Sequence, residues 1–209
     1  STQTTDIKRK TSTTAMANGK VILLGEHAVV YGKPAIAVPI KNAVVAEVSD
    51  SSQPPEIHVP AWDIDDKLEE SNTVWWQAIQ DVFRILGIAE QNFSVHVKPN
   101  IPAAMGLGGS AAIAVAIVRA VSCHFKLDLT EEETNQFAFQ CEKAAHGTPS
   151  GIDNTIATYG QPLVYRSGEQ QHLDILEFTR PLNLVIGISD HPSLTVDMVA
   201  GVRARWRRH

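Results

Sequence analysis

The sequence predicts an α+β or α/β fold in which helices pack on a sheet of mixed strand pairing. Short segments with the alternation or apolar content of strands are interspersed with longer segments of helical periodicity. Their order is irregular, and the chain has no internal repeat, low-complexity tract or obvious linker. With 209 residues, 44% of them hydrophobic and 20% charged, the chain is long and apolar enough to bury a substantial core.

Strand-like segments follow a polar stretch at residues 1–14, which we expect to be a flexible lead-in. The apolar run after Lys20 predicts a short buried strand. The segment 35–48 contains Pro39 and is typical of either a strand pair or one long bent strand. The strands expected in order are 20–24, 35–48, 56–59, 93–98, 163–165 and 182–188.

Helical periodicity is found in four segments, at about 71–86, 110–125, 130–145 and 194–208. Gly87 ends the first helix, whose apolar stripe is Val74, Trp75, Ala78, Ile79, Val82 and Leu86. Thr130 and Glu133 have the spacing of a capping box and open the third helix. The last helix repeats an apolar side chain every four residues, at Leu194, Met198, Val202 and Trp206. That stripe must be buried against something, so we expect further structure to cover it.

Composition excludes several classes of function. The formal charge of −5, from 18 Lys+Arg and 23 Asp+Glu, argues against a dedicated nucleic-acid binder. The uncharged stretch 99–118 is interrupted by prolines and glycines, so we expect no membrane span, and no apolar segment of a secretory signal follows the basic residues near the start. Two cysteines, Cys123 and Cys141, predict reduced thiols in a cytoplasmic protein.

A glycine-rich loop at 102–112, PAAMGLGGSAA, leads into the second helix. Glycines let the backbone approach an anion, and the unpaired N–H groups of a helix start favour negative charge, so the loop predicts a phosphate cradle. The alternatives are a tight turn without a ligand and a loose dinucleotide fingerprint. The fingerprint is disfavoured because Asp128, the acidic residue at the right distance, lies between two helices. No lysine of the Walker A type closes the loop.

A second polar segment, at 141–160, combines glycine, proline and carboxylates after the capped helix. A rigid loop here would aim Asp153 at a reacting hydroxyl, and Glu142 would be a ligand for Mg²⁺. The alternative is a structured turn in which Asp153 and Asn154 cap the apolar segment that follows.

A third polar group surrounds the first strand, with Lys20 where the strand begins and Glu26 and His27 where it ends. Neighbouring residues of a strand point to opposite faces, which argues against a shared metal for Glu26 and His27. Taken singly, these residues are typical of a protein surface or a satisfied core.

Together, the three segments resemble the GHMP kinase superfamily, and within it the mevalonate kinases. The resemblance is carried by GKVILLGEHAVVYGKPAIAVP at 19–39, the glycine loop, and EKAAHGTPSGIDN at 142–154, and it spans about residues 17–203. It implies a two-layer fold of mixed sheet and helices. Residues 15–180 would form the N-terminal domain, and 181–209 the start of a C-terminal domain that the sequence does not complete.

The resemblance also implies an enzyme that transfers a phosphoryl group from ATP to the C5 hydroxyl of mevalonate, with Mg²⁺. Asp153 would be the base, with Lys20 beside it. Ser110 and Glu142 would hold the metal, and the ATP phosphates would contact Gly106, Leu107, Gly108, Gly109, Ser110 and Ala111. The mevalonate contacts would be Lys20, Glu26, His27, Asp153 and Thr195.

Some positions depart from that family's pattern. Gly109 and Ser110 stand where two serines are usual, Asn18 precedes Gly19 where proline is common, and Thr195 lacks a nearby basic residue. Two other functions remain open: phosphorylation of another small alcohol, such as phosphomevalonate, and a binding fragment without catalysis. A homodimer also remains open.

Overall fold

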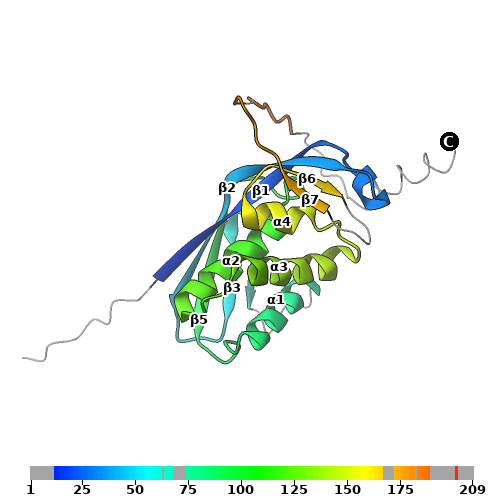
Figure 1. Ribbon diagram of the computed structural model, residues 1–209. Helices are drawn as coiled ribbons and strands as arrows, with labels where there is room; N and C mark the ends of the chain where they lie inside the picture. The colour runs from blue at the N-terminus through cyan, green and yellow to red at the C-terminus, as the bar shows by residue number, and fades with distance from the viewer. Residues whose placement is uncertain are drawn as a thin grey trace, which may run out of the picture.

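The computed structural model describes residues 12–62, 64–67, 74–166, 172–181, 183–188 and 201. They form two layers, a seven-stranded mixed sheet and four α-helices gathered on one of its faces (Figure 1). The predicted fold class is therefore confirmed. In this part of the chain no helix combines the length and the apolar character needed to cross a membrane.

The sheet is built around one long strand, β2. Its strands are β1 (Ser12–Leu24), β2 (Ala35–Asp50), β3 (Glu56–Val59), β4 (Ile64–Lys67), β5 (Phe93–Pro99), β6 (Leu163–Arg166) and β7 (His172–Ile175). The order is β4-β3-β5-β2-β6-β7, and β1 pairs with β2. Among the described strands, the β3–β5 pair alone is parallel and the other pairs are antiparallel.

The segment around Pro39 is one continuous strand, which settles the two alternatives for residues 35–48. Along one edge, β2 pairs with β1 over almost its whole length, and Lys20 lies opposite Pro39. Along the other edge, residues 35–37 pair with β6 and residues 44–50 with β5. On this second edge Pro39 lies between the two pairings, at a position where no described strand pairs with β2. Proline is tolerated best at such unpaired edge positions, because it has no N–H to donate.

The helices are α1 (Val74–Ile85), α2 (Gly109–Phe125), α3 (Glu131–His146) and α4 (Ile152–Tyr159), with short 3₁₀ turns η1 (Ala28–Tyr31) and η2 (Pro60–Trp62). Helix α2 is the centre of the core, because it contacts β1, β2, α3 and α4 and buries most of its side chains. Helix α3 begins with the expected capping box, in which the Glu133 N–H donates to Thr130 Oγ1 and the Thr130 N–H donates to Glu133 Oε2.

The apolar stripe predicted for α1 is partly wrong. Ile79 and Val82 are buried as expected, but Val74 is exposed. Trp76 and Phe83 are buried in its place, so the helix is rotated relative to the predicted face. Phe83 packs edge-on against Phe93 of β5, a contact that accompanies this rotation.

The strand predictions need three corrections. Strand β1 begins at Ser12, inside the expected lead-in, and its end is not buried as expected, because residues 21–23 are half-buried and Leu24 is exposed. Residues 183–188 form no strand, and the side chain of Val185 is 99% exposed. Strands β4 and β7 were not predicted. The helix expected at 194–208 lies outside the described residues except for Gly201.

Candidate functional site

Four of the predicted site residues come together where α2 begins. The sheet contributes Lys20 from β1, the glycine loop contributes Ser110 in the first turn of α2, α3 contributes Glu142 near its end, and α4 contributes Asp153 in its first turn. Two pairs define the site: Lys20 with Asp153, and Ser110 with Glu142.

The glycine loop lies directly against β1. The Lys20 N–H donates to the Leu107 carbonyl at 2.9 Å, and a Cβ at Gly19 would lie 2.8 Å from the same oxygen. Gly108 caps α2 with a φ of +72°, and a Cβ there would lie 2.8 Å from Lys20 Cγ. Glycine suits this position for two reasons. Residues with a side chain rarely adopt a positive φ, and any Cβ here would collide with the Lys20 side chain.

The start of α2 presents unpaired backbone donors. The first helical hydrogen bond runs from the Ala112 N–H to the Gly108 carbonyl, so the N–H groups of 109–111 have no partner within the helix. The positive end of the helix dipole adds to this field, which suits an anion such as phosphate.

Lys20 and Asp153 form an ion pair with 3.3 Å between Nζ and Oδ1. The lysine side chain is 6% exposed and the aspartate 31% exposed, so the ammonium group is buried while the carboxylate remains open to solvent. An aspartate in the first turn of a helix is also stabilised by the helix dipole. The arrangement offers an ionised carboxylate beside a fixed positive charge.

Helix α4, which carries Asp153, was not predicted as a helix. Its N-cap is Gly151 and no side chain caps it, so the alternative in which Asp153 and Asn154 cap the segment is wrong. The preceding turn is held by three side-chain contacts: the Ile152 N–H donates to Ser150 Oγ, Thr155 Oγ1 donates to the Gly151 carbonyl, and the Tyr165 hydroxyl donates to the Ser150 carbonyl.

Ser110 and Glu142 are joined directly, because Ser110 Oγ donates to Glu142 Oε1 at 2.7 Å. The Glu142 side chain is 3% exposed. Burial raises the pKa of this carboxyl from 4.5 to about 7; the Ser110 hydrogen bond opposes the rise, the charge of Asp153 adds to it, and Lys20 opposes it. These influences show that the two pairs act on one another electrostatically.

His146 also lies at this site, although no role was predicted for it from the sequence. His146 Nε2 lies 3.7 Å from Glu142 Oε2, one helical turn further along α3. The spacing of four residues on a helix was the available signal, since such residues share a face.

The oxygen pair fits a magnesium ion. Mg²⁺ prefers hard oxygen ligands and usually takes only one or two protein carboxylates together with phosphate oxygens and water. A hydroxyl and a carboxylate that already touch, beside the start of a helix whose N–H groups suit an anion, match this preference. Within the described residues no group of three or more His, Cys, Asp or Glu could hold a metal, so a site made only of such side chains is not formed there.

Glu26 and His27 do not join the site in this structure. They follow β1 in a turn rather than closing a strand, and His27 has a φ of 58°. Across the described part of the chain, neither side chain forms an ion pair or hydrogen bond with Lys20 or Asp153. Thr195 lies outside the described residues.

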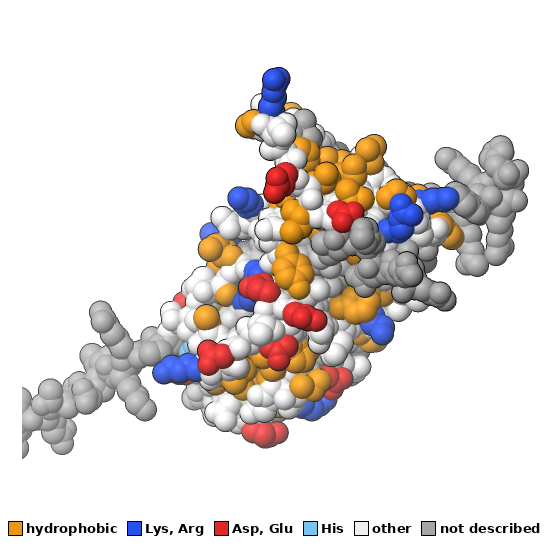
Figure 2. All heavy atoms as spheres, viewed as in Figure 1, with side chains coloured by type: hydrophobic (Ala, Val, Ile, Leu, Met, Phe, Trp, Pro, Cys, Tyr) orange, Lys and Arg blue, Asp and Glu red, His pale blue; other side chains and the backbone are white. Residues whose placement is uncertain are grey.

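The helical face drawn in Figure 2 carries acidic side chains among neutral and apolar ones. Its described Lys and Arg side chains are scattered rather than gathered in a stripe. From the end of α4 onwards, the exposed apolar side chains are Tyr159, Ile175, Phe178, Leu184, Val185, Ile186 and Ile188.

Comparison with known proteins gives a consistent result. A family model described as "GHMP kinases N terminal domain" matches residues 72–161, which include the glycine loop, Glu142 and Asp153. The chain is 35% identical to a mevalonate kinase of Pyrococcus abyssi over 92% of its length, and 36% identical to one of Methanothermobacter thermautotrophicus over 93%. It covers 61% and 62% of these two proteins, so it spans about three fifths of their length.

Solved structures agree with the sequence relatives. The crystal structure of L. major mevalonate kinase in complex with R-mevalonate has a TM-score of 0.74 and 28% identity, with 97% of this chain and 64% of that one covered. A mevalonate kinase from methicillin-resistant Staphylococcus aureus has a TM-score of 0.58 and 34% identity, with 79% and 55% covered. The chain is similar to GHMP kinases over the part that the family model matches, and the relatives and the two solved structures named here are mevalonate kinases.

Proposed function

We propose that this protein transfers the γ-phosphoryl group of ATP to the C5 hydroxyl of mevalonate, giving 5-phosphomevalonate for isoprenoid biosynthesis. The observation that supports this proposal most is the Lys20–Asp153 ion pair, which lies beside the Ser110–Glu142 pair at the start of α2. The names of the relatives supply the proposed substrate, because the geometry supports a phosphate and an alcohol in general and favours no particular alcohol.

The phosphate chain of ATP would lie over the glycine loop. The free N–H groups of 109–111 would donate to its oxygens, and the absence of side chains allows the backbone to come close. The residues assigned to this contact are Gly106, Leu107, Gly108, Gly109, Ser110 and Ala111.

Asp153 would accept the proton of the attacking hydroxyl. Its carboxylate is partly open to solvent, so an alcohol can reach it, and the buried Lys20 ammonium holds it at 3.3 Å. Lys20 would also offset the negative charge that develops on the transferring group. Phosphoryl transfer needs this positioning and charge neutralisation more than covalent chemistry.

Ser110 and Glu142 would hold Mg²⁺. When bound, the ion would neutralise charge on the phosphate oxygens. The contribution of the chain is to bring a hydroxyl and a carboxylate to one point, and to keep that point next to the N–H groups that bind phosphate.

The remaining assignments follow from the resemblance. Glu26, His27 and Thr195 are proposed to contact mevalonate, together with Lys20 and Asp153. A cytoplasmic location is supported by the free cysteines, Cys123 exposed and Cys141 buried, which suit a reducing compartment. Light scattering, which measures the molar mass in solution, would show whether the protein forms a homodimer.

The test is ADP release with a panel of alcohols, comparing mevalonate with phosphomevalonate and homoserine at saturating ATP and Mg²⁺. Turnover with mevalonate that exceeds the others at least tenfold supports the proposal. Preference for phosphomevalonate or another alcohol would assign a different member of the superfamily. ATP binding without turnover on any alcohol would instead assign a binding fragment.

A further inference from the structure

Arg119 lies in an otherwise apolar helix and has no place in the proposed chemistry. It is the only Lys, Arg, Asp or Glu in α2, whose other side chains are mostly buried alanine, valine and isoleucine. Its own side chain is 22% exposed. A charge is costly to place in such a helix unless its partners compensate, so the partners of Arg119 indicate its purpose.

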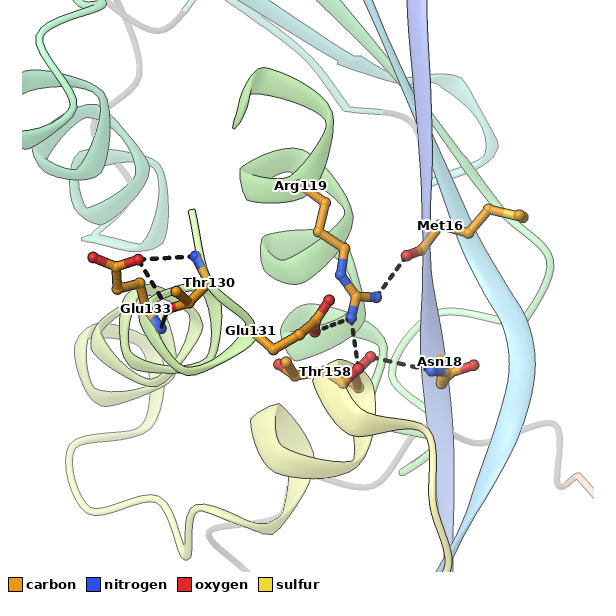
Figure 3. A network of polar contacts seen from close by, with 8 residues as sticks. Met16, Asn18, Arg119, Thr130, Glu131, Glu133 and Thr158 are labelled. Carbon is orange, nitrogen blue, oxygen red and sulfur yellow. Dashed lines mark hydrogen bonds and ion pairs between the residues drawn. The ribbon is translucent and has the colours of Figure 1, made fainter. Parts of the chain in front are cut away.

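The guanidinium joins three other elements (Figure 3). Nη1 donates to the Met16 carbonyl of β1 at 2.9 Å, and Nη2 donates to the Thr158 carbonyl of α4 at 2.6 Å. Nη2 also forms an ion pair with Glu131, the first residue of α3. The planar fork of arginine suits contacts in several directions at once.

The contact with α4 falls where that helix needs a partner. The last four carbonyls of a helix lack donors within it, and a positive charge there also complements the dipole. Arg119 supplies a donor to Thr158, and Asn18 of β1 supplies one to the neighbouring Ala157 carbonyl at 3.3 Å. At eight residues, α4 is too short to be stable alone, so its position depends on such contacts.

The four joined elements are the same four that carry the site. Ser110 lies on α2, nine residues before Arg119, which is about 14 Å along a helix. Lys20 follows Met16 by four residues on β1, and Asp153 precedes Thr158 by five residues on α4. Arg119 therefore contacts β1, α3 and α4 at a distance from the site residues that these same elements carry.

We propose that Arg119 is the positioning residue of this site, fixing α4 against β1 so that Asp153 stays in place beside Lys20. The structural part of this proposal stands on the contacts alone, and its catalytic consequence rests on the proposed function. Arg119 itself touches no reacting atom.

The test replaces Arg119 and measures hydrogen exchange of α4 together with turnover. In R119Q we expect amide exchange in the peptide 152–160 to quicken by about tenfold or more, because α4 loses its charged cap. We expect kcat with mevalonate to fall by about 10- to 100-fold, the usual cost of a small misplacement of a reacting group. The KM for ATP should stay within about twofold, because the phosphate loop lies at the other end of α2.

R119K separates charge from geometry. Lysine keeps the positive charge but lacks the fork, so it should restore part of the exchange protection and of kcat, but not all. R119K also replaces R119Q in both measurements if R119Q fails to fold. I79V, which leaves a small cavity beside α1, is the control for a general loss of stability, since Ile79 is buried in a different core cluster from Ile152 and Ile156 of α4. It should lower Tm without changing kcat.

The outcomes distinguish this proposal from the function on which it partly rests. If exchange of 152–160 in R119Q is no faster than in I79V, Arg119 does not hold α4 and the proposal is wrong. If exchange quickens but kcat is unchanged, its catalytic part is wrong. If the unaltered protein phosphorylates no alcohol, the proposed function fails, while the exchange comparison still decides whether Arg119 positions α4.

Discussion

Glu142 combines two properties that oppose one another, because its carboxylate is deeply buried and its proposed task requires it to be charged. Burial raises its pKa from 4.5 to about 7. The unfolded chain therefore loses this proton near pH 4.5, while the folded protein keeps it until about pH 7. Stability from this group is present at low pH and declines as pH rises through that window, by about 3 kcal/mol in total.

E142Q removes this pH dependence, because glutamine cannot ionise. Without nucleotide and Mg²⁺, we expect E142Q to melt at a higher temperature than the unaltered protein at pH 8, with the advantage shrinking towards pH 5. E132Q, which alters an exposed carboxylate on the same helix, is the control. Calorimetry at pH 5, 6.5 and 8 measures the effect, and parallel pH curves for E142Q and the unaltered protein would disprove it.

Ser110 gives a second prediction at the residue scale. S110A removes the hydroxyl that contacts Glu142, so it should raise the Mg²⁺ concentration needed for half-maximal rate several-fold, with the fold intact. S122A is the matched control, because Ser122 lies on the same helix, where it accepts from the Leu129 N–H far from the site. The measurement is rate against free Mg²⁺. Equal Mg²⁺ curves for S110A and S122A would exclude Ser110 as a ligand.

At the scale of elements, the glycine loop and β1 fit together through Gly108. G108A adds a Cβ that would lie 2.8 Å from Lys20 Cγ, at a φ of +72°. Gly87, after α1, has a φ of +71° but open space around it, so G87A carries the same backbone cost of about 1 kcal/mol without the clash. We expect G108A to lower Tm further than G87A, and to lower kcat at least tenfold because Lys20 moves.

Stability and turnover of the two variants decide this point. If G108A and G87A lose the same Tm and both keep kcat, the close approach of the loop to Lys20 has no functional importance.

Elements with their own local signals were predictable. Helix α3 has its capping box, and α2 begins after glycines and runs through an unbroken apolar sequence. Helix α4 was missed because it has no capping side chain and follows a Gly- and Pro-rich turn; contacts from Arg119 and Asn18 hold its end. The run 183–188 suggested a strand by its apolar residues, but it pairs with nothing among the described strands.

At the scale of the whole molecule, the site depends on contacts that span most of the chain. Lys20 and Asp153 are separated by 133 residues, and Ser110 and Glu142 by 32, so no local pattern shows that they meet. The motifs indicated which residues to consider, and the resemblance indicated their roles. The burial of Glu142 and the joining role of Arg119 required the folded structure, because each depends on elements packed side by side, whereas the contact of His146 with Glu142 follows from their spacing on one helix.

The most direct test of phosphoryl transfer at this site is the kcat of D153N for ADP formation with mevalonate, measured beside its Kd for ATP. Asparagine keeps the size of the side chain but cannot accept the proton. We predict that kcat falls by about 10²- to 10⁴-fold, the range for loss of a general base, while the Kd for ATP changes by less than about twofold. A D153N protein that keeps most of its turnover would contradict this site, and would leave Asp153 as no more than a partner of Lys20 in the fold.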